Sequence, residues 1–173
     1  MAAIPDGSAN ILNKPTFVER GFLKFLIMDA PTDGNIQAYI QVLSKRKVAA
    51  VVLACEPSYN TIPLTDAGIH VEDLPFADGG VPPAATVSRW LALVADIVGK
   101  DNKDEKAIAV HCVAGLGRAP VLVAIALLEY GMDAPDAVAF IRKRRRGAIN
   151  RVQLEYLNAY KSKKPAGCCV LMC

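Results

Sequence analysis

The sequence predicts a single α/β domain in which helices flank a central, mostly parallel β-sheet. Strand-like apolar runs alternate with segments of helical spacing along the chain. The run 48–55 is continuously apolar, as strands buried on both faces are, and 107–112 predicts a further buried strand. The length of 173 residues, with 53% hydrophobic and 21% charged residues, fits one ordinary domain. We expect a loosely ordered lead-in over 1–19, the domain over 20–161 and a basic, Cys-containing tail over 162–173.

The first half of the predicted domain contains three strands and a helix. Residues 22–28 predict the first strand, and Asp33 is the expected N-cap of the helix that follows. The apolar side of this helix consists of Ile36, Tyr39, Ile40 and Leu43. Residues 48–55 predict a buried parallel strand, and the alternating segment 69–74 predicts another.

The second half of the predicted domain contains one strand and four helices. A helix is expected from Pro82 to about Val98, followed by a buried strand over 107–112. The next helix carries Pro120 in its first turn and continues to Glu129. Segments 134–146 and 151–160 predict the last two helices.

The charge distribution is asymmetric, although the net charge of the chain is only +3. Residues 142–164 contain nine basic residues and one acidic residue, a net charge of +8, so the rest of the chain carries −5. A basic C-terminal end of this kind indicates which partners the protein attracts, and it says nothing about the fold.

The sequence also predicts a cytoplasmic location. No signal peptide is visible at the N-terminus, and the longest apolar run, 119–128, is about half of the ~20 residues that a membrane-spanning helix needs. Five cysteines, an odd number with three at the tail, fit a reduced intracellular setting better than a disulfide framework.

One predicted loop contains the residues with the clearest catalytic pattern in the sequence. It reads His111-Cys112-Val113-Ala114-Gly115-Leu116-Gly117-Arg118. Because the loop joins a buried strand to an apolar helix, its N–H groups and the positive end of the helix converge on one spot. Such a concavity binds tetrahedral oxyanions, phosphate above all, and the two glycines permit the backbone angles that it needs. Residues 113–118 are therefore the predicted phosphate-binding residues.

Cys112 is the predicted nucleophile of this loop. A helix N-terminus and a nearby cation lower the pKa of a thiol from its usual ~8.5, and the thiolate can attack phosphorus. Arg118 can hold two phosphate oxygens bidentately. His111 either packs in the core or orients Cys112 from behind. The competing interpretation of Cys112 is a buried structural cysteine in a glycine turn.

Departure of the leaving group needs a general acid from another loop, and Asp78 is the candidate. It lies just beyond a predicted strand, on a loop flanked by proline and glycine that could open and close. An exposed turn aspartate before glycine is the alternative interpretation. Glu72 and Asp73 are weaker candidates because they lie inside the strand pattern.

The segment from His111 to Ala124, HCVAGLGRAPVLVA, resembles the active-site segment of the phosphatases of regenerating liver. This class, also called protein tyrosine phosphatase 4A, belongs to the dual-specificity cysteine phosphatases. Further matches are found at residues 54–56, 68–71, 75–76 and 140–148, and the resemblance covers roughly residues 20–160. It implies a phosphatase that hydrolyses phosphate monoesters of phosphoproteins or phosphoinositides through a phosphocysteine. No cofactor is expected, and two histidines with isolated carboxylates give no metal-ligand cluster.

The resemblance also implies a role for each matching residue. Cys112 would form the phosphocysteine, Arg118 would clamp the phosphate, and Asp78 would be the acid of a mobile loop. Cys55 would form a reversible disulfide with Cys112, although a structural cysteine is the alternative there. Most cysteine phosphatases carry Ser or Thr where this chain has Ala119, so we expect slow breakdown of the phosphocysteine.

The acid loop departs from the pattern of the class. Members usually read Trp-Pro-Phe-Asp-Asp-Gly, whereas residues 74–79 read Leu-Pro-Phe-Ala-Asp-Gly. The second aspartate, Asp78, is retained and the first is lost. The acid assignment therefore stands, with altered packing expected in the loop.

The resemblance offers a second function of another kind, a largely non-catalytic binding module. Members of the class dock on CBS-domain magnesium transport mediators, and the state of Cys112 would switch that docking. A homo-oligomer is a further expected association. Sulfur transfer of the rhodanese type also uses a Cys loop after a strand, but Arg118 and a separate acid loop argue against it.

The basic residues suggest a membrane surface as a partner. Arg142–Arg146 and Lys161–Lys164 would attract the anionic cytoplasmic leaflet, giving peripheral membrane association. A solvated helix end is the alternative for the first run, and nucleic acid is not expected because no aromatic residues interleave with the charges. The class ends in a prenylation box whose cysteine is fourth from the end. Cys169 is the lipidation candidate here, one residue out of place because Cys173 follows.

Overall fold

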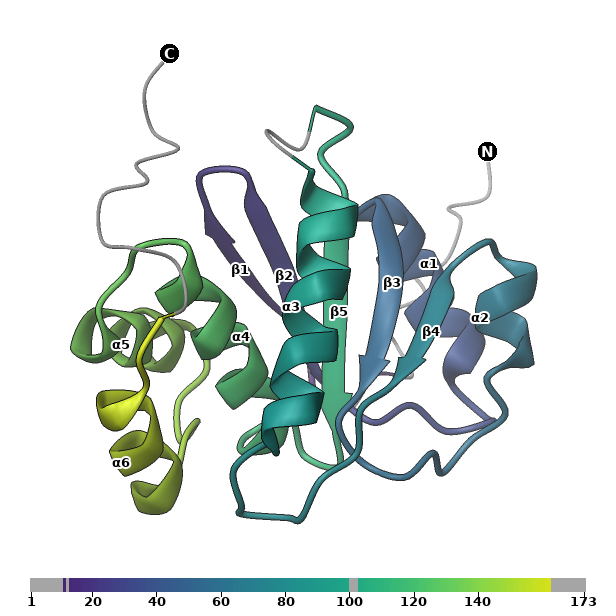
Figure 1. Ribbon diagram of the computed structural model, residues 1–173. Coiled ribbons are helices and arrows are strands. Elements are labelled where there is room, and N and C mark those ends of the chain that lie inside the picture. Colours follow the sequence, from purple (N-terminus) through teal and green to yellow (C-terminus); the bar gives the residue numbers. More distant parts are fainter. Residues whose placement is uncertain (1–10, 12, 100–102, 163–173) are drawn as a thin grey trace.

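A five-stranded sheet forms the centre of the computed structural model, which describes residues 11, 13–99 and 103–162 (Figure 1). The strands are β1 (Thr16–Arg20), β2 (Leu23–Asp29), β3 (Val48–Leu53), β4 (His70–Asp73) and β5 (Ala107–Cys112). Their order across the sheet is β1-β2-β5-β3-β4, and every neighbouring pair is parallel except β1 with β2. The mostly parallel sheet predicted from the sequence is confirmed.

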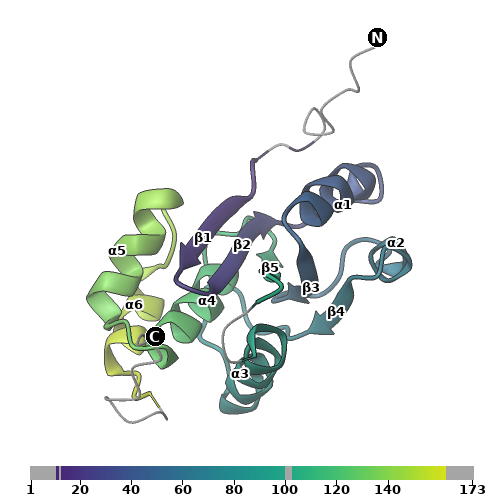
Figure 2. The ribbon, with the colours of Figure 1, turned by 90° about the horizontal axis from the view of Figure 1, so that it is seen from above.

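Helices cover both faces of this sheet (Figure 2). One face carries α1 (Ile36–Lys45) and α2 (Ile62–Asp66), and the other carries α3 (Ala84–Val98) and α4 (Arg118–Glu129). The last two helices, α5 (Ala134–Arg144) and α6 (Arg151–Ala159), pack against α4. Alternate residues of β5 enter the two cores, which explains why every residue of the strand except His111 is apolar.

Helix α4 is the most enclosed of the helices. All of its residues are buried, because the sheet, α3 and the α5–α6 pair surround it. The indole Nε1 of Trp90 in α3 donates a 2.6 Å hydrogen bond to the carbonyl oxygen of Leu122. This bond ties α3 to α4.

The carboxyl ends of β3, β4 and β5 lie at one edge of the sheet, the lower edge in Figure 1. The loops that follow these strands gather there. Ligands of open α/β sheets bind at this edge. The loops that contain Cys55 and Asp78 begin there, and Cys112 ends β5 at the same edge.

Several local expectations are wrong. Residues 16–19 lie within the expected lead-in but belong to β1, because the turn at Gly21 (φ +57°) returns the chain to pair with β2 as an edge strand. Helix α2 was not predicted. Helix α1 has Asn35 rather than Asp33 as its N-cap, and Asp33 Oδ1 instead accepts a hydrogen bond from the backbone N–H of Asn60.

Candidate active site

Residues 113–117 connect β5 to α4, where the sequence predicts phosphate binding, and we call this connection the phosphate loop. Gly115 has a φ of +63°, and a Cβ at this position would overlap the carbonyl oxygen of Met28. Only glycine fits both the backbone angle and the space. Backbone hydrogen bonds tether the loop at both ends: Ala30 N–H donates to Val113 O (3.0 Å) and Ile149 N–H donates to Leu116 O (2.8 Å).

The side chain of Arg145 supports this loop from behind. Its Nε donates to Gly115 O at 2.6 Å and one terminal nitrogen donates to Ala114 O at 3.0 Å. The other terminal nitrogen reaches Thr16 Oγ1 at 3.1 Å and Ile27 O at 3.4 Å. Arg145 is buried, and burial lowers the pKa of its guanidinium. A cation behind the loop thus holds two of its carbonyl groups in place.

Cys112 and Arg118 stand at the two ends of the phosphate loop. Cys112 is the last residue of β5 and is 3% exposed, and Arg118 is the first residue of α4 and is 7% exposed. The N-cap residue of α4 is Gly117, which has no side chain to cap the first N–H groups of the helix. Those groups and the positive end of α4 are available to an anion at the loop.

Arg118 joins the phosphate loop to the acid loop that follows β4. One terminal nitrogen lies 3.2 Å from Asp78 Oδ1, and the other donates to Phe76 O at 3.2 Å. The Nε of Arg118 is buried and has no hydrogen-bond acceptor within the described part of the chain. A buried donor without a protein partner is what a bound oxyanion would use.

Cys55 lies beside the site because β3 neighbours β5. The backbone N–H of Ala54 donates to His111 O at 2.9 Å, and both Cys55 and Cys112 belong to the same core cluster. The two cysteines are free thiols. Burial raises the pKa of the Cys55 thiol, and the nearby charge of Arg118 opposes this effect.

His111 is enclosed directly before Cys112. It is fully buried, and its Nε2 forms a 2.9 Å hydrogen bond with the hydroxyl of Tyr59. Burial lowers the pKa of His111 to about 4, so the imidazole is neutral at physiological pH. The ring is therefore packed in the core with Tyr59 as its partner, and a role of His111 in orienting Cys112 stays a prediction.

The structure brings the expected site residues to one edge of the sheet, but it divides the basic run. Within Arg142–Arg146, Arg142 donates to Ala148 O (3.0 Å) and Ile149 O (2.8 Å), and Arg145 holds the phosphate loop. The expectation that the whole run faces a membrane is wrong for these two arginines, because backbone carbonyl groups engage them. Cys169 and residues 163–164 lie outside the described residues.

Comparison with known proteins agrees with this geometry. Residues 32–163 match the family described as dual specificity phosphatase, catalytic domain.

The chain belongs to this family.

Among relatives, "Probable protein tyrosine phosphatase type IVA A" of Dictyostelium discoideum is 52% identical over 92% of this chain and 95% of its own length. The PRL-1 phosphatase of Drosophila melanogaster is 50% identical over 86% of this chain and 84% of its own length. A solved protein tyrosine phosphatase of Leishmania major superposes with a TM-score of 0.78 at 40% identity, covering 86% of this chain and 99% of its own. These matches place this dual-specificity phosphatase in the type IVA class, and it is a protein tyrosine phosphatase.

Sequence reasoning missed four residues around the site of this phosphatase. They are Tyr59, Arg145, Asn150 and Gln153. Asn150 and Gln153 carry a detectable signal, because an N-cap residue followed three positions later by Gln marks a capping box. The contacts of Tyr59 and Arg145 are long-range in sequence, so no local pattern predicts them.

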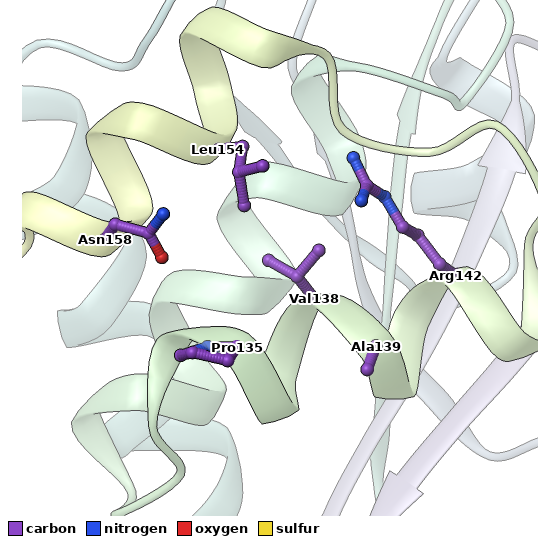
Figure 3. Close-up of a pocket in the computed structure, with 6 residues that line it drawn as sticks. All are labelled: Pro135, Val138, Ala139, Arg142, Leu154 and Asn158. Atoms are coloured by element: carbon purple, nitrogen blue, oxygen red, sulfur yellow. The ribbon is translucent and has the colours of Figure 1, made fainter.

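A groove of ≈390 Å³, lined by residues other than those of the phosphate loop, lies between α5 and α6 (Figure 3). Its lining consists of Pro135, Val138, Ala139, Arg142, Leu154 and Asn158.

In the described part of the chain, no group of three or more side chains could hold a metal ion. No helix among the described residues is long and apolar enough to cross a membrane.

Proposed function

We propose that this phosphatase works through a phosphocysteine on Cys112, with Arg118 as the phosphate clamp and Asp78 as the general acid. The carrying observation is the contact of Arg118 with Asp78 at 3.2 Å, because it brings the acid loop over the phosphate loop. The phosphate-binding groups would be the N–H groups of residues 113–117 together with the guanidinium of Arg118.

The reaction would proceed in two displacements. The Cys112 thiolate attacks phosphorus, the P–O bond to the leaving group breaks, and Asp78 donates its proton to the departing oxygen. Water then attacks phosphorus, the S–P bond breaks, and the Asp78 carboxylate accepts the proton from water. The proposed substrates are phosphoproteins or phosphoinositides.

Kinetics of three variants test these roles. Cys112→Ser should abolish turnover of aryl phosphates. Asp78→Asn should lower kcat/KM by about 10²–10⁴-fold for substrates with poor leaving groups. Asp66→Asn, the same change at an exposed residue at the end of α2, is the matched control and should have no effect. Full activity of Cys112→Ser would overturn the mechanism.

We also propose slow hydrolysis of the phosphocysteine, because Ala119 offers no hydroxyl beside Arg118. Ala119 is fully buried in the first turn of α4. A serine at this position should accelerate the second displacement and raise kcat more than kcat/KM. Rapid phosphocysteine breakdown in the unchanged chain during a single turnover would contradict this proposal.

Redox control is proposed through a disulfide between Cys112 and Cys55. Hydrogen peroxide would oxidise the Cys112 thiolate to a sulfenic acid with release of water. The Cys55 thiol would then attack that sulfur and release a second water. The support is that both are free thiols in one buried cluster at the ends of neighbouring strands. Peroxide inactivation should be reversed by dithiothreitol in the unchanged chain and not in Cys55→Ser.

A docking role is the second candidate, and one observation favours it. Val113 and Leu116, on the phosphate loop itself, are 66% and 39% exposed although both are apolar. Exposed apolar residues beside a pocket favour contact with a protein surface. A CBS-domain magnesium transport mediator is the proposed partner. Val113→Ser should weaken that binding while sparing hydrolysis of small aryl phosphates.

Peripheral membrane association remains a proposal for the exposed cations. Lys143, Arg144, Arg146 and Lys161 are exposed in the structure. Each exposed cation near an anionic leaflet contributes ~1 kcal/mol of attraction. The fraction of the protein that sediments with phosphatidylserine vesicles should fall as salt is added. Binding that does not depend on salt would argue against an electrostatic contact.

A further inference from the structure

The N-terminus of α6 contacts the acid loop through two side-chain amides. Asn150 Nδ2 donates to the carbonyl oxygen of Gly79 at 2.9 Å, and Gln153 Nε2 donates to that of Gly80 at 3.0 Å. Both acceptors directly follow Asp78 in the chain. The loop that carries the proposed acid is therefore held from a helix that sequence analysis did not connect with the site.

Gln153 also touches the phosphate loop. It is fully buried, and a Cβ added to Gly117 would lie 3.2 Å from its Nε2. The same amide thus fills the space between Gly117 in the phosphate loop and Gly80 in the acid loop. A side chain larger than glycine at position 117 would push this amide out of place.

The capping box of α6 fixes the direction of both amides. Asn150 Oδ1 accepts from Gln153 N–H at 2.9 Å, and Gln153 Oε1 accepts from Asn150 N–H at 3.0 Å. With each oxygen occupied in the cap, each NH₂ group is directed outward to a loop carbonyl. The cap and the loop contact use different atoms of the same two side chains, so substitutions can separate them.

We propose that Asn150 and Gln153 are positioning residues that hold the acid loop closed over the phosphate loop. The need for such a hold follows from the exposure of the loop, since the side chain of Asp78 is 85% exposed and the loop lies on the surface. Two added hydrogen bonds favour the closed arrangement, in which Asp78 and Arg118 are in contact. This inference rests on the proposed function of Asp78.

The test compares leaving groups in variants that keep the cap and lose the loop contact. Asn150→Asp and Gln153→Glu retain the oxygen acceptors of the capping box but have no NH₂ donor. Gln153→Met removes the donor without adding charge, and it also removes the Oε1 acceptor of the capping box. Asn158→Asp, the same chemical change on the exposed side of α6, is the control. The measured quantity is kcat/KM for phenyl phosphate, a poor leaving group, and for difluoromethylumbelliferyl phosphate, a good one.

Each lost donor should lower kcat/KM for phenyl phosphate by about 2- to 10-fold, the effect of one net hydrogen bond on an equilibrium. Activity on the good leaving group should hardly change, because its departure needs no acid. In an Asp78→Asn background the α6 substitutions should have no further effect. Equal losses on both substrates, or a further loss in that background, would overturn the proposal.

The same variants test the role of Asp78 as the acid separately from the positioning role of Asn150 and Gln153. If Asp78→Asn itself shows no dependence on leaving group, the assignment of Asp78 as the acid fails. If Asp78→Asn shows that dependence and the Asn150 and Gln153 variants do not, only the positioning role fails. Urea unfolding of each variant reports whether the cap survives, since loss of a cap lowers the free energy of unfolding.

Discussion

Replacement of Arg145 by methionine should damage the phosphate loop, whereas the same replacement at its neighbour Arg146 should not. Methionine keeps much of the length of the side chain and removes every donor. In Arg145→Met, the carbonyl groups of Ala114 and Gly115 lose their partners, at 3.0 and 2.6 Å, and Ile27 O loses a longer contact. Arg146 is exposed and provides a matched control with the same chemical change.

The expected magnitude follows from these contacts. A hydrogen bond to a charged donor contributes roughly 1.5–3 kcal/mol, and buried carbonyl groups left unpaired carry a penalty of similar size. The guanidinium, however, is itself buried and so desolvated, which lowers its pKa, and methionine removes that cost. The net loss in the free energy of unfolding should be about 2–4 kcal/mol for Arg145→Met, against less than about 0.5 kcal/mol for Arg146→Met.

Two assays measure this difference. Urea denaturation gives the free energy of unfolding, and the shift of the melting temperature with added tungstate, a phosphate analogue, gives the oxyanion affinity. Arg145→Met should lose both stability and tungstate response, because the loop N–H groups are no longer held in one orientation. If Arg145→Met and Arg146→Met behave alike in both assays, the support of the loop by Arg145 is refuted.

Two further predictions concern the same region. Gly115→Ala should abolish oxyanion binding and lower the free energy of unfolding by more than ~1 kcal/mol. The left-handed φ of residue 115 disfavours alanine, and the added Cβ would overlap Met28 O. Titration with tungstate and urea denaturation measure the two effects. His111, with a pKa lowered to about 4 from the model-peptide value of 6.5, should remain neutral in the folded state while it protonates in the unfolded chain. Stability from this group is therefore present above about pH 6.5 and lost as the pH falls towards 4. The free energy of unfolding should drop by about 2 kcal/mol more in the unchanged chain than in His111→Gln between pH 7 and 4.5.

Strands and helices with strong local patterns were predictable, and the reason is visible in β5. Apart from His111, its residues 107–112 are apolar on both faces because helices cover both sides of the sheet, and the predicted bounds match the observed strand. β1 was missed for the converse reason. It is an edge strand with only Val18 fully buried, so tertiary pairing with β2 rather than its own composition determines its structure.

The chemistry-bearing loop was predictable because its residues are contiguous. Cys112, the glycines and Arg118 lie within seven positions between a strand and a helix, and the geometry of that connection follows from the fold class. Asp78 was predictable as a candidate because it follows a strand that ends at the same edge. The supports of these loops were not predictable, since Arg145 reaches residues 30 or more positions away and Gln153 reaches Gly80 across 73 positions.

The segment between α5 and α6 explains why a basic run can be mistaken for a surface patch. Ile149 in this segment is a buried, β-branched residue at a φ of +66°, a conformation that is strained for its side-chain type. Two contacts stabilise it: Arg142 donates to its carbonyl oxygen, and its own N–H donates to Leu116 O in the phosphate loop. Arginines that fix a strained turn are part of the framework of the site, whatever their contribution to the net charge.

That framework links three features that the sequence presents separately. Arg145 at the end of α5 holds the back of the phosphate loop, and Asn150 and Gln153 at the start of α6 hold the acid loop. Only eight positions separate Arg145 from Gln153. A displacement of this short segment would therefore move both loops at once. Because the oxyanion site and the acid share one support, binding of phosphate and closure of the acid loop should be coupled through it rather than through Arg118 alone.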